Sequence, residues 1–427
     1  MILTTILVLL AMLALSIPVA AVLGALALTL GQLYAFLPLH LAIGELAWVS
    51  NTSVILVAIP LFILLGEILL RSGIAENMYA AATHWLSWLP GGLMHSNIGS
   101  CAMFAAISGS SVATAATIGT VAIDQIDKRG YNERFFLGTI AAGGTIGILI
   151  PPSINMIVYG VLTETSIVQL YLAGFTPGII LAGLFMLTVV IGCVLRPKWG
   201  GRKVETNWEK RIRSLPDLVP PILIFIVVIG SIYSGIATPT ESAALGVLAA
   251  LALVAWRRRL TISMLRLALE GTMRTTAMIM AILVAAYFLN FVINVIGLTA
   301  QVNAMITGLG WTPMQTLIGV ICFYVVLGMF METLSMMVAT VPIITPVIVS
   351  LGFDPVWFGI IIILLIETAM ITPPVGINLF VVQGVRGRGH LHDVMIGATP
   401  FVITLMVMIV LLIIFPDIAM WLPNMTM

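Results

Sequence analysis

Long apolar stretches follow one another along nearly the whole chain. Each is close to the ~20 residues that a helix needs to cross a bilayer core, and short polar segments separate them. Two interruptions fall inside an apolar run, at ILIPPSINM (149–157) and ITPPVGINL (371–379). Because proline lacks an N–H donor and clashes with the preceding turn, these runs predict broken helices at Pro151–Pro152 and Pro373–Pro374.

Composition places the chain in the membrane class. Of 427 residues, 61% are hydrophobic and 8% are charged, against roughly 25% charged in soluble domains. We therefore expect an all-α polytopic membrane protein whose surroundings are the lipid bilayer, with no nucleic-acid partner. An intramembrane enzyme would need a catalytic pair at one depth, and no His or Lys lies near the hydroxyl-rich segment 108–117. We expect no enzymatic activity and no organic cofactor.

The basic residues give a topology. Taking basic loops as cytoplasmic puts all 18 Lys and Arg on one side of the membrane, provided that two segments enter and leave by the same face. These are 97–124, which would open to the cytoplasm, and 314–349, which would open to the opposite face. Irregular backbone at membrane depth is tolerated only where it is buried in protein or lines a cavity. Two opposed re-entrant hairpins therefore suggest one enclosed site.

The N-terminal apolar region allows two interpretations. Residues 2–33 could form one long span or two short ones hinged at residues 16–18. We favour two, which gives about ten transmembrane helices besides the hairpins.

An internal repeat relates the two halves. A shift of 222 positions carries Pro151 and Pro152 to Pro373 and Pro374, and Gly24 to Gly246. Matches in order at one spacing indicate a duplication, with repeats 1–215 and 216–427. The loop before the first proline pair is basic and its counterpart 350–356 is not, so the repeats are inverted across the membrane. Inverted repeats with broken helices are typical of secondary transporters.

The helix breaks and the hairpin tips contain polar groups but no Lys or Arg. A half-helix N-terminus suits an anionic carboxylate, and hydroxyl and carbonyl oxygens suit Na+ over a transition metal. The tips are SGSSVATAAT (108–117) and GMFMETLS (328–335). Small polar residues also occur wherever membrane helices pack closely. The pairing of a polar tip with a proline break in both halves favours a site, while Glu332 and Glu367 remain open between site and structural roles.

At these residues the chain resembles the large membrane subunit of tripartite ATP-independent periplasmic (TRAP) transporters. The stretches that carry the resemblance are 59–73, 108–123, 144–160, 235–246 and 367–381. The resemblance implies an elevator-type fold, in which a transport domain with both hairpins and both broken helices slides against a scaffold. It also implies Na+-coupled uptake of an organic acid anion that a soluble periplasmic binding protein delivers, in the bacterial inner membrane.

The resemblance further implies site residues. The residues expected to bind Na+ are Ser108, Ser110, Ser111, Thr145 and Gly147 in the first half, and Gly328, Thr333, Thr368 and Thr372 in the second. The remaining tip and break residues are expected to face the substrate: Gly109, Pro151, Pro152, Ser153, Asn155, Glu332, Pro373, Pro374, Gly376 and Asn378.

Partners and substrate follow from the same resemblance. The family's small four-helix membrane subunit is expected to be a separate polypeptide, because this chain has no space for it before its first repeat. Sialic acid is the favoured substrate, with C4-dicarboxylates and other organic acids as alternatives. The rival hypothesis is an autonomous Na+/dicarboxylate symporter or ion antiporter of similar fold, which needs no binding protein.

Overall fold

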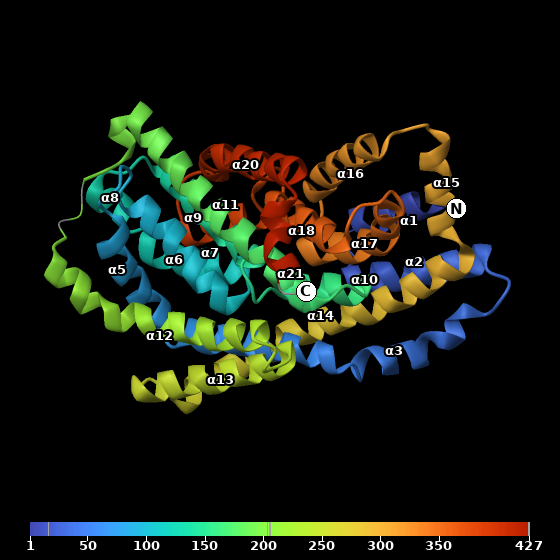
Figure 1. Cartoon of the computed structure of the whole chain (residues 1–427), viewed down its shortest axis with the longest axis horizontal. Helices are drawn as coiled ribbons and strands as arrows, with labels where there is room; N and C mark the ends of the chain where they lie inside the picture. The colour runs from blue at the N-terminus through green and yellow to red at the C-terminus, as the bar shows by residue number, and fades with distance from the viewer. Residues whose placement is uncertain (16, 203, 205, 426–427) are drawn as a thin grey trace.

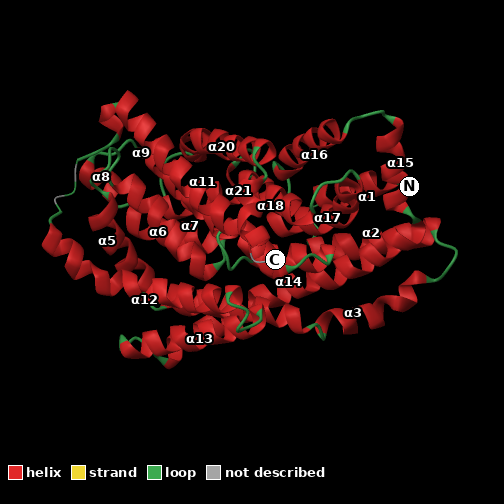
Figure 2. Cartoon of the chain, viewed as in Figure 1, coloured by secondary structure: helices red, strands yellow, loops and turns green. Residues whose placement is uncertain are grey.

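The computed structural model describes residues 1–15, 17–202, 204 and 206–425. Throughout these residues the chain is helical and forms no strand, and Tyr131 and Gly200 make an isolated β-bridge. Figure 2 shows helices joined mostly by short loops. This agrees with the all-α membrane fold that the sequence predicts.

The described residues of the first half form fourteen helical elements. They are α1 (Ile2–Ala14), α2 (Val19–Tyr34), η1 (Leu39–Ala42), α3 (Ile43–Asn51), η2 (Val54–Val57), α4 (Ala58–Arg71), α5 (Ile74–Leu86), α6 (Leu93–Ser108), α7 (Ser111–Ala122), α8 (Gln125–Arg129), α9 (Glu133–Leu149), α10 (Ile154–Thr163), α11 (Ile167–Leu195) and η3 (Pro197–Trp199). The N-terminal region is thus two helices, as we favoured.

The second half consists of α12 (Trp208–Tyr233), α13 (Pro239–Trp256), α14 (Ile262–Ile296), α15 (Leu298–Gly308), α16 (Pro313–Gly328), α17 (Thr333–Ser350), α18 (Pro355–Ile371), α19 (Ile377–Arg386), α20 (Leu391–Ile414) and α21 (Asp417–Met425). Helix α18 starts at 355 and ends at 371, each 222 positions after the corresponding end of α9. Helix α17 likewise starts 222 positions after α7. The offset read from the proline pairs therefore also relates helix ends.

The helices form two packed groups. In Figure 1, α2, α3, α12, α13 and α14 lie as a long layer along one side, and the hairpins and broken helices lie above it. Helix α14 packs on α2, α3 and α4, and α13 packs on α4 and α12. In the second group, α9 packs on α6, α7, α18 and α20.

Helices α9 and α20, from different halves, cross at two glycines. A Cβ atom added at Gly138 would overlap the carbonyl oxygen of Gly397, and one added at Gly397 would overlap the carbonyl oxygen of Arg134. Small residues let membrane helices approach this closely. The crossing joins the two halves within one packed body.

Both proline segments interrupt a helix. Helix α9 ends at Leu149 and α10 begins at Ile154, and the two axes differ by 43°. In the second half, α18 ends at Ile371 and α19 begins at Ile377. Proline cannot complete the helical hydrogen-bond ladder, and a break falls at each of these two pairs, whereas a third pair, Pro220–Pro221, lies within α12.

By length and hydropathy, seven of the described helices could cross a membrane, or eight if the bent pair α9–α10 counts as one span. Helix α17, one arm of the second hairpin, is among the seven, whereas α1, α2, α16 and α18 are shorter apolar helices. The number of about ten crossings remains a prediction.

Candidate functional site

The first hairpin tip is the turn between α6 and α7. Ser110 caps α7, because its Oγ accepts a hydrogen bond from the backbone N–H of Ala113 (3.3 Å). Thr114 Oγ1 donates to the carbonyl oxygen of Ser110 (2.7 Å) and lies 3.2 Å from Ser108 Oγ. Hydroxyl and carbonyl oxygens therefore gather at this turn, where Ser108 and Thr114 are buried.

Gly109 brings this tip against the first helix break. Its φ of +59° is left-handed, and a Cβ atom there would lie 2.7 Å from the carbonyl oxygen of Pro152. Only glycine combines that backbone angle with so close an approach at little cost. On another side of the tip, a Cβ atom at Gly66 of α4 would lie 3.0 Å from the carbonyl oxygen of Ser108. The tip is thus held between the break and helix α4.

The first tip also contacts the second helix break. The amide Nδ2 of Asn378, in the first turn of α19, donates to Ser111 Oγ (2.8 Å) and to the carbonyl oxygen of Ala141 (3.1 Å). Asn378 is fully buried, and its Oδ1 has no hydrogen-bond partner among the described residues. A buried amide oxygen without a partner is uncommon in proteins. This oxygen therefore lies next to the first tip with its acceptor capacity unused by the described residues.

The remaining first-half candidates surround these contacts. Thr145 is fully buried and its Oγ1 donates to the carbonyl oxygen of Ala142 (2.8 Å), while a Cβ atom at Gly147 would meet Ala105 Cβ at 3.0 Å. Ser153 caps α10 through the N–H of Met156 (3.4 Å). These residues are buried, together with Pro151, Pro152 and Asn155.

The second hairpin tip uses a carboxylate where the first uses a hydroxyl. Glu332, 222 positions after Ser110, caps α17 by accepting hydrogen bonds from the N–H groups of Leu334 (3.2 Å) and Ser335 (3.1 Å). The hydroxyls of Thr333 (2.9 Å) and Ser335 (2.8 Å) also donate to it. These hydrogen bonds stay within the helix end, and they give Glu332 a structural role. Its predicted contact with substrate stays a prediction.

Gly328 brings the second hairpin against α18. A Cβ atom there would meet Ala369 Cβ at 2.5 Å. The hydroxyls of Thr368 and Thr372 donate to the carbonyl oxygens of Leu364 (2.8 Å) and Thr368 (2.6 Å) of their own helix. Their oxygens therefore remain able to accept. These contacts lie next to the second break.

The two breaks differ in exposure and in capping. Pro374 is exposed and Pro373 is half-buried, whereas both prolines of the first break are buried. Gly376, the N-cap of α19, has a φ of +41° and no side-chain cap, so the first N–H groups of α19 have no side-chain partner at that position. Unpaired N–H groups at a helix N-terminus favour an anion. The N-terminus of α19 therefore lacks the side-chain cap that Ser153 gives to α10.

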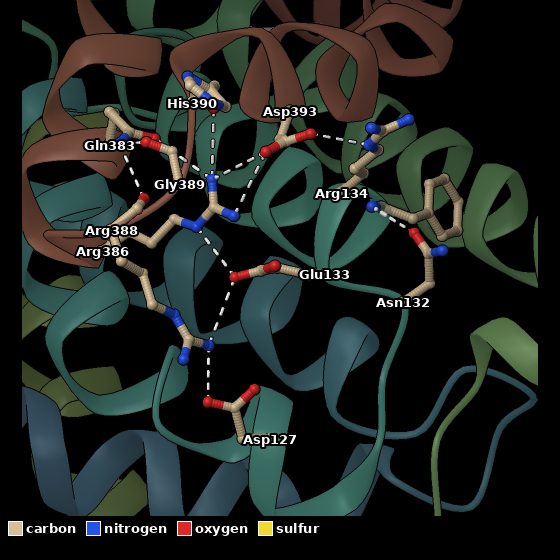
Figure 3. Close-up of polar contacts among 11 residues, drawn as sticks. Asp127, Asn132, Glu133, Arg134, Gln383, Arg386, Arg388, Gly389, His390 and Asp393 are labelled. Carbon is tan, nitrogen blue, oxygen red and sulfur yellow. Dashed lines mark hydrogen bonds and ion pairs between the residues drawn. The ribbon is translucent and has the colours of Figure 1, made fainter.

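Near the opposite end of α9 and α19, an ion-pair cluster joins both halves (Figure 3). Arg386, whose side chain is 3% exposed, contacts Glu133 (2.9 Å) and Asp393 (3.4 Å). Asp393 also pairs with Arg134 (2.8 Å), and Arg388 pairs with Asp127 (2.6 Å). From the sequence, these arginines are predicted only to be cytoplasmic charges. Their carboxylate partners lie in α8, at the start of α9 and in the first turn of α20.

A family model described as "Tripartite ATP-independent periplasmic transporter, DctM component" matches residues 6–418. The chain belongs to this DctM family of large TRAP permeases. It is 34% identical to the C4-dicarboxylate TRAP transporter large permease protein DctM of Pseudomonas aeruginosa, over 86% of each chain. It is also 32% identical to the ectoine TRAP transporter large permease protein TeaC of Halomonas elongata, again over 86% of each.

A third relative of this DctM-family chain is longer. The isethionate TRAP transporter permease protein DctMQ of Oleidesulfovibrio alaskensis is 32% identical over 86% of this chain but only 58% of its own length. Among solved structures, the YdaH transporter of Alcanivorax borkumensis matches with a TM-score of 0.58 over 99% of this chain and 98% of that one. At 16% identity that likeness concerns the fold alone.

Family membership fixes the general class. Large TRAP permeases are multi-pass inner-membrane proteins, and the family works with a small membrane subunit and a periplasmic binding protein. Its members are transport proteins, in agreement with the transporter class that the broken helices indicate.

Proposed function

We propose that this chain carries out Na+-coupled uptake of an organic acid anion, of the sialic acid or C4-dicarboxylate class. The observation that carries the proposal is the orphaned amide oxygen of Asn378 beside Ser111 at the first hairpin tip. Na+ prefers hard, uncharged or anionic oxygen ligands, and the tip supplies several within one turn.

Na+ enters this proposal as a transported ion. Candidate ligands are the Asn378 amide oxygen, the hydroxyls of Ser108, Ser111 and Thr145, and the carbonyl oxygens that Gly109 exposes at its left-handed turn. The second half offers the hydroxyls of Thr333, Thr368 and Thr372. Ser111 and Thr333 occupy the same position in the two repeats, 222 residues apart, and this correspondence supports a second ion site in the second half.

The anion would bind at the α19 N-terminus. Gly376 has no side chain to cap this end, and Asn378 lies in the first turn with its Nδ2 aimed at the first tip. An anion there would gain from the helix dipole. Na+ bound at the neighbouring sites would attract the anion electrostatically. Binding of either ion would therefore favour binding of the other.

The names of the relatives indicate the general class of substrate and no single compound. Their names specify C4-dicarboxylates, ectoine and isethionate, which are small, strongly polar solutes. Sialic acid remains our favoured alternative from the sequence. All four therefore belong in the first substrate panel.

We further propose that transport follows an elevator mechanism. The packed body that holds both hairpins and both breaks would move against the layer of α2, α3, α12, α13 and α14. A periplasmic binding protein would deliver the substrate, and a separate small membrane subunit would bind the fixed layer.

The test is uptake by proteoliposomes that contain this chain and its small subunit. Labelled succinate, sialic acid, ectoine and isethionate are offered with and without a Na+ gradient, and with and without the binding protein. We expect uptake of one of them only when both Na+ and the binding protein are present. Uptake of free substrate without the binding protein would support the autonomous symporter instead. Uptake driven by a proton gradient in Na+-free buffer would contradict Na+ coupling.

A further inference from the structure

A large apolar cavity lies between the second hairpin and the N-terminal helix. It encloses about 370 Å³ and is lined by α1, α14, α15, α16 and α17, with one residue of α2. This volume is in the range of cavities that bind whole small molecules. None of the candidate transport residues lines it.

The lining is almost entirely hydrocarbon. The lining residues include no charged side chain, and their only hydroxyls are those of three threonines. Thr5, Thr316 and Thr340 each donate to a carbonyl oxygen of their own helix, at 3.1, 3.2 and 2.6 Å. Apart from the Trp311 indole, every side-chain polar group of the lining is thus paired within the protein. Water is also a poor occupant, because a cavity without free polar partners stays dry.

The cavity has a buried floor and an exposed rim. Leu26, Ile293 and Ala339 at its floor are at most 5% exposed, whereas Ile6 and Leu309 on its walls are 47% and 54% exposed. The cavity is therefore continuous with the outer surface of the helices. In an apolar membrane-spanning region, that surface faces lipid.

Trp311 lies at the rim, over helix α16. A Cβ atom at Gly319 would lie 2.9 Å from the Trp311 ring, which is 48% exposed. Tryptophan favours the boundary between hydrocarbon and headgroups, and the stretch 298–313 carries no basic residue. These features place the mouth of the cavity in the leaflet opposite the basic loops.

We propose that this cavity binds an acyl chain of a phospholipid from the non-cytoplasmic leaflet. The occupant has to be apolar, able to enter from the lipid-facing surface, and anchored by a headgroup at the level of Trp311. A bilayer phospholipid meets all three requirements and surrounds the mouth at high concentration. An empty apolar cavity of this size would destabilise the fold.

The lipid would affect transport through its place between two groups of helices. Helices α1 and α14 line the cavity together with the hairpin α16–α17. Movement of the hairpin would change the shape of the cavity, so the chain would have to shift or leave. This consequence rests on the proposed elevator mechanism, whereas the binding itself does not.

Photolabelling tests the binding. The chain with its small subunit is placed in phosphatidylethanolamine and phosphatidylglycerol vesicles that contain phosphatidylethanolamine with a diazirine in its acyl chain. After illumination, labelled peptides are identified by mass spectrometry. We expect stronger labelling of the cavity peptides that hold Ile6, Met305 and Phe323 than of the outer face of α12.

Two variants fill the cavity from opposite walls, Ala339→Phe from α17 and Ile6→Trp from α1. Both should lose the strong labelling, and Val227→Phe on the 44% exposed face of α12 should keep it. Ile6→Trp lies on an exposed wall, so it serves if Ala339→Phe fails to fold. Labelling no stronger than at α12, or unchanged in a folded filling variant, would overturn the proposal. Labelling that occurs only without the small subunit would show that a subunit helix occupies the cavity, and would overturn it too.

Discussion

Asn378 of the second half donates a hydrogen bond to Ser111 of the first half, across 267 positions of sequence. The bond ties the first hairpin tip to the second helix break. It also leaves the amide oxygen of Asn378 without a protein partner among the described residues. The first hairpin tip therefore contacts the helix break of the second repeat as well as the break of its own repeat.

Replacing Asn378 with alanine should impair transport and stability together. The variant leaves Ser111 Oγ and the carbonyl oxygen of Ala141 without their donor, at a cost of about 1–3 kcal/mol. Thermal unfolding and Na+-driven uptake measure the two effects. The control is Asn294→Ala, which removes the exposed bond to Asn290 outside the site. In a double-mutant cycle with Ser111→Ala, additive losses would show that the two side chains act independently.

Gly109→Ala should abolish transport because the added Cβ meets the carbonyl oxygen of Pro152. The matched control is Gly130→Ala, which also has a left-handed φ, of +68°, but open space around it. Both variants lose about 1 kcal/mol from the backbone angle, and only Gly109→Ala displaces the break. Equal uptake by the two variants would mean that the close approach of tip and break is unimportant.

Thr145→Val should weaken the stabilisation that Na+ confers. A ligand that binds only the folded state adds about 2.7 kcal/mol at a concentration of 100 Kd, so the melting temperature should rise with Na+ and not with K+. The valine variant keeps the shape and removes the hydroxyl. Thr272→Val is the control, since that hydroxyl also bonds to its own helix but lies in α14. A normal Na+ response in Thr145→Val would remove this residue from the cation site.

Arg386→Ala should destabilise the fold strongly. Its buried guanidinium pairs with Glu133 and Asp393, and removal of one partner of a buried pair costs about 3–5 kcal/mol. Arg213→Ala, from an exposed pair with Glu209, should cost less than about 1 kcal/mol. Thermal unfolding in detergent compares them. Similar melting temperatures would show that the cluster in Figure 3 contributes little.

Glu332→Ala should lower stability by about 1 kcal/mol, the usual cost of losing an N-cap. Glu332→Ser should recover much of that loss, because serine at the equivalent position caps α7. Denaturant unfolding of the three proteins gives the order. If the serine variant were stable but failed to transport, the carboxylate would have a second role in the site. An alanine variant as stable as the parent would contradict the capping role.

The proline pairs and glycines predicted much of the fold because their effects are local. Both breaks lie at the proline pairs that the sequence indicates, whereas a third pair, Pro220–Pro221, lies within the continuous helix α12. The turn at Gly109 follows from a single residue for the same reason. Even the division of residues 2–33 into two helices follows from the proline at position 18.

The contacts between distant segments could not be read in this way. Nothing near Arg386 in sequence identifies Glu133, 253 positions earlier, as its partner. The same is true of Asn378 and Ser111, which were both candidates but for separate reasons. Glu332 shows the opposite difficulty, since a carboxylate in an apolar segment suits a binding site and a helix cap equally well. Only the positions of neighbouring N–H groups distinguish these roles.

The glycine crossing of α9 and α20 also limits where motion can occur. The two backbones are in direct contact at Gly138 and Gly397, with no side chain between them. The two helices are therefore expected to move together. If the packed body moves as proposed, the change in backbone conformation has to occur at its margins, where Gly73 precedes α5 and Gly297 lies between α14 and α15, both in the left-handed region. Those two glycines would then be the hinges of the proposed movement.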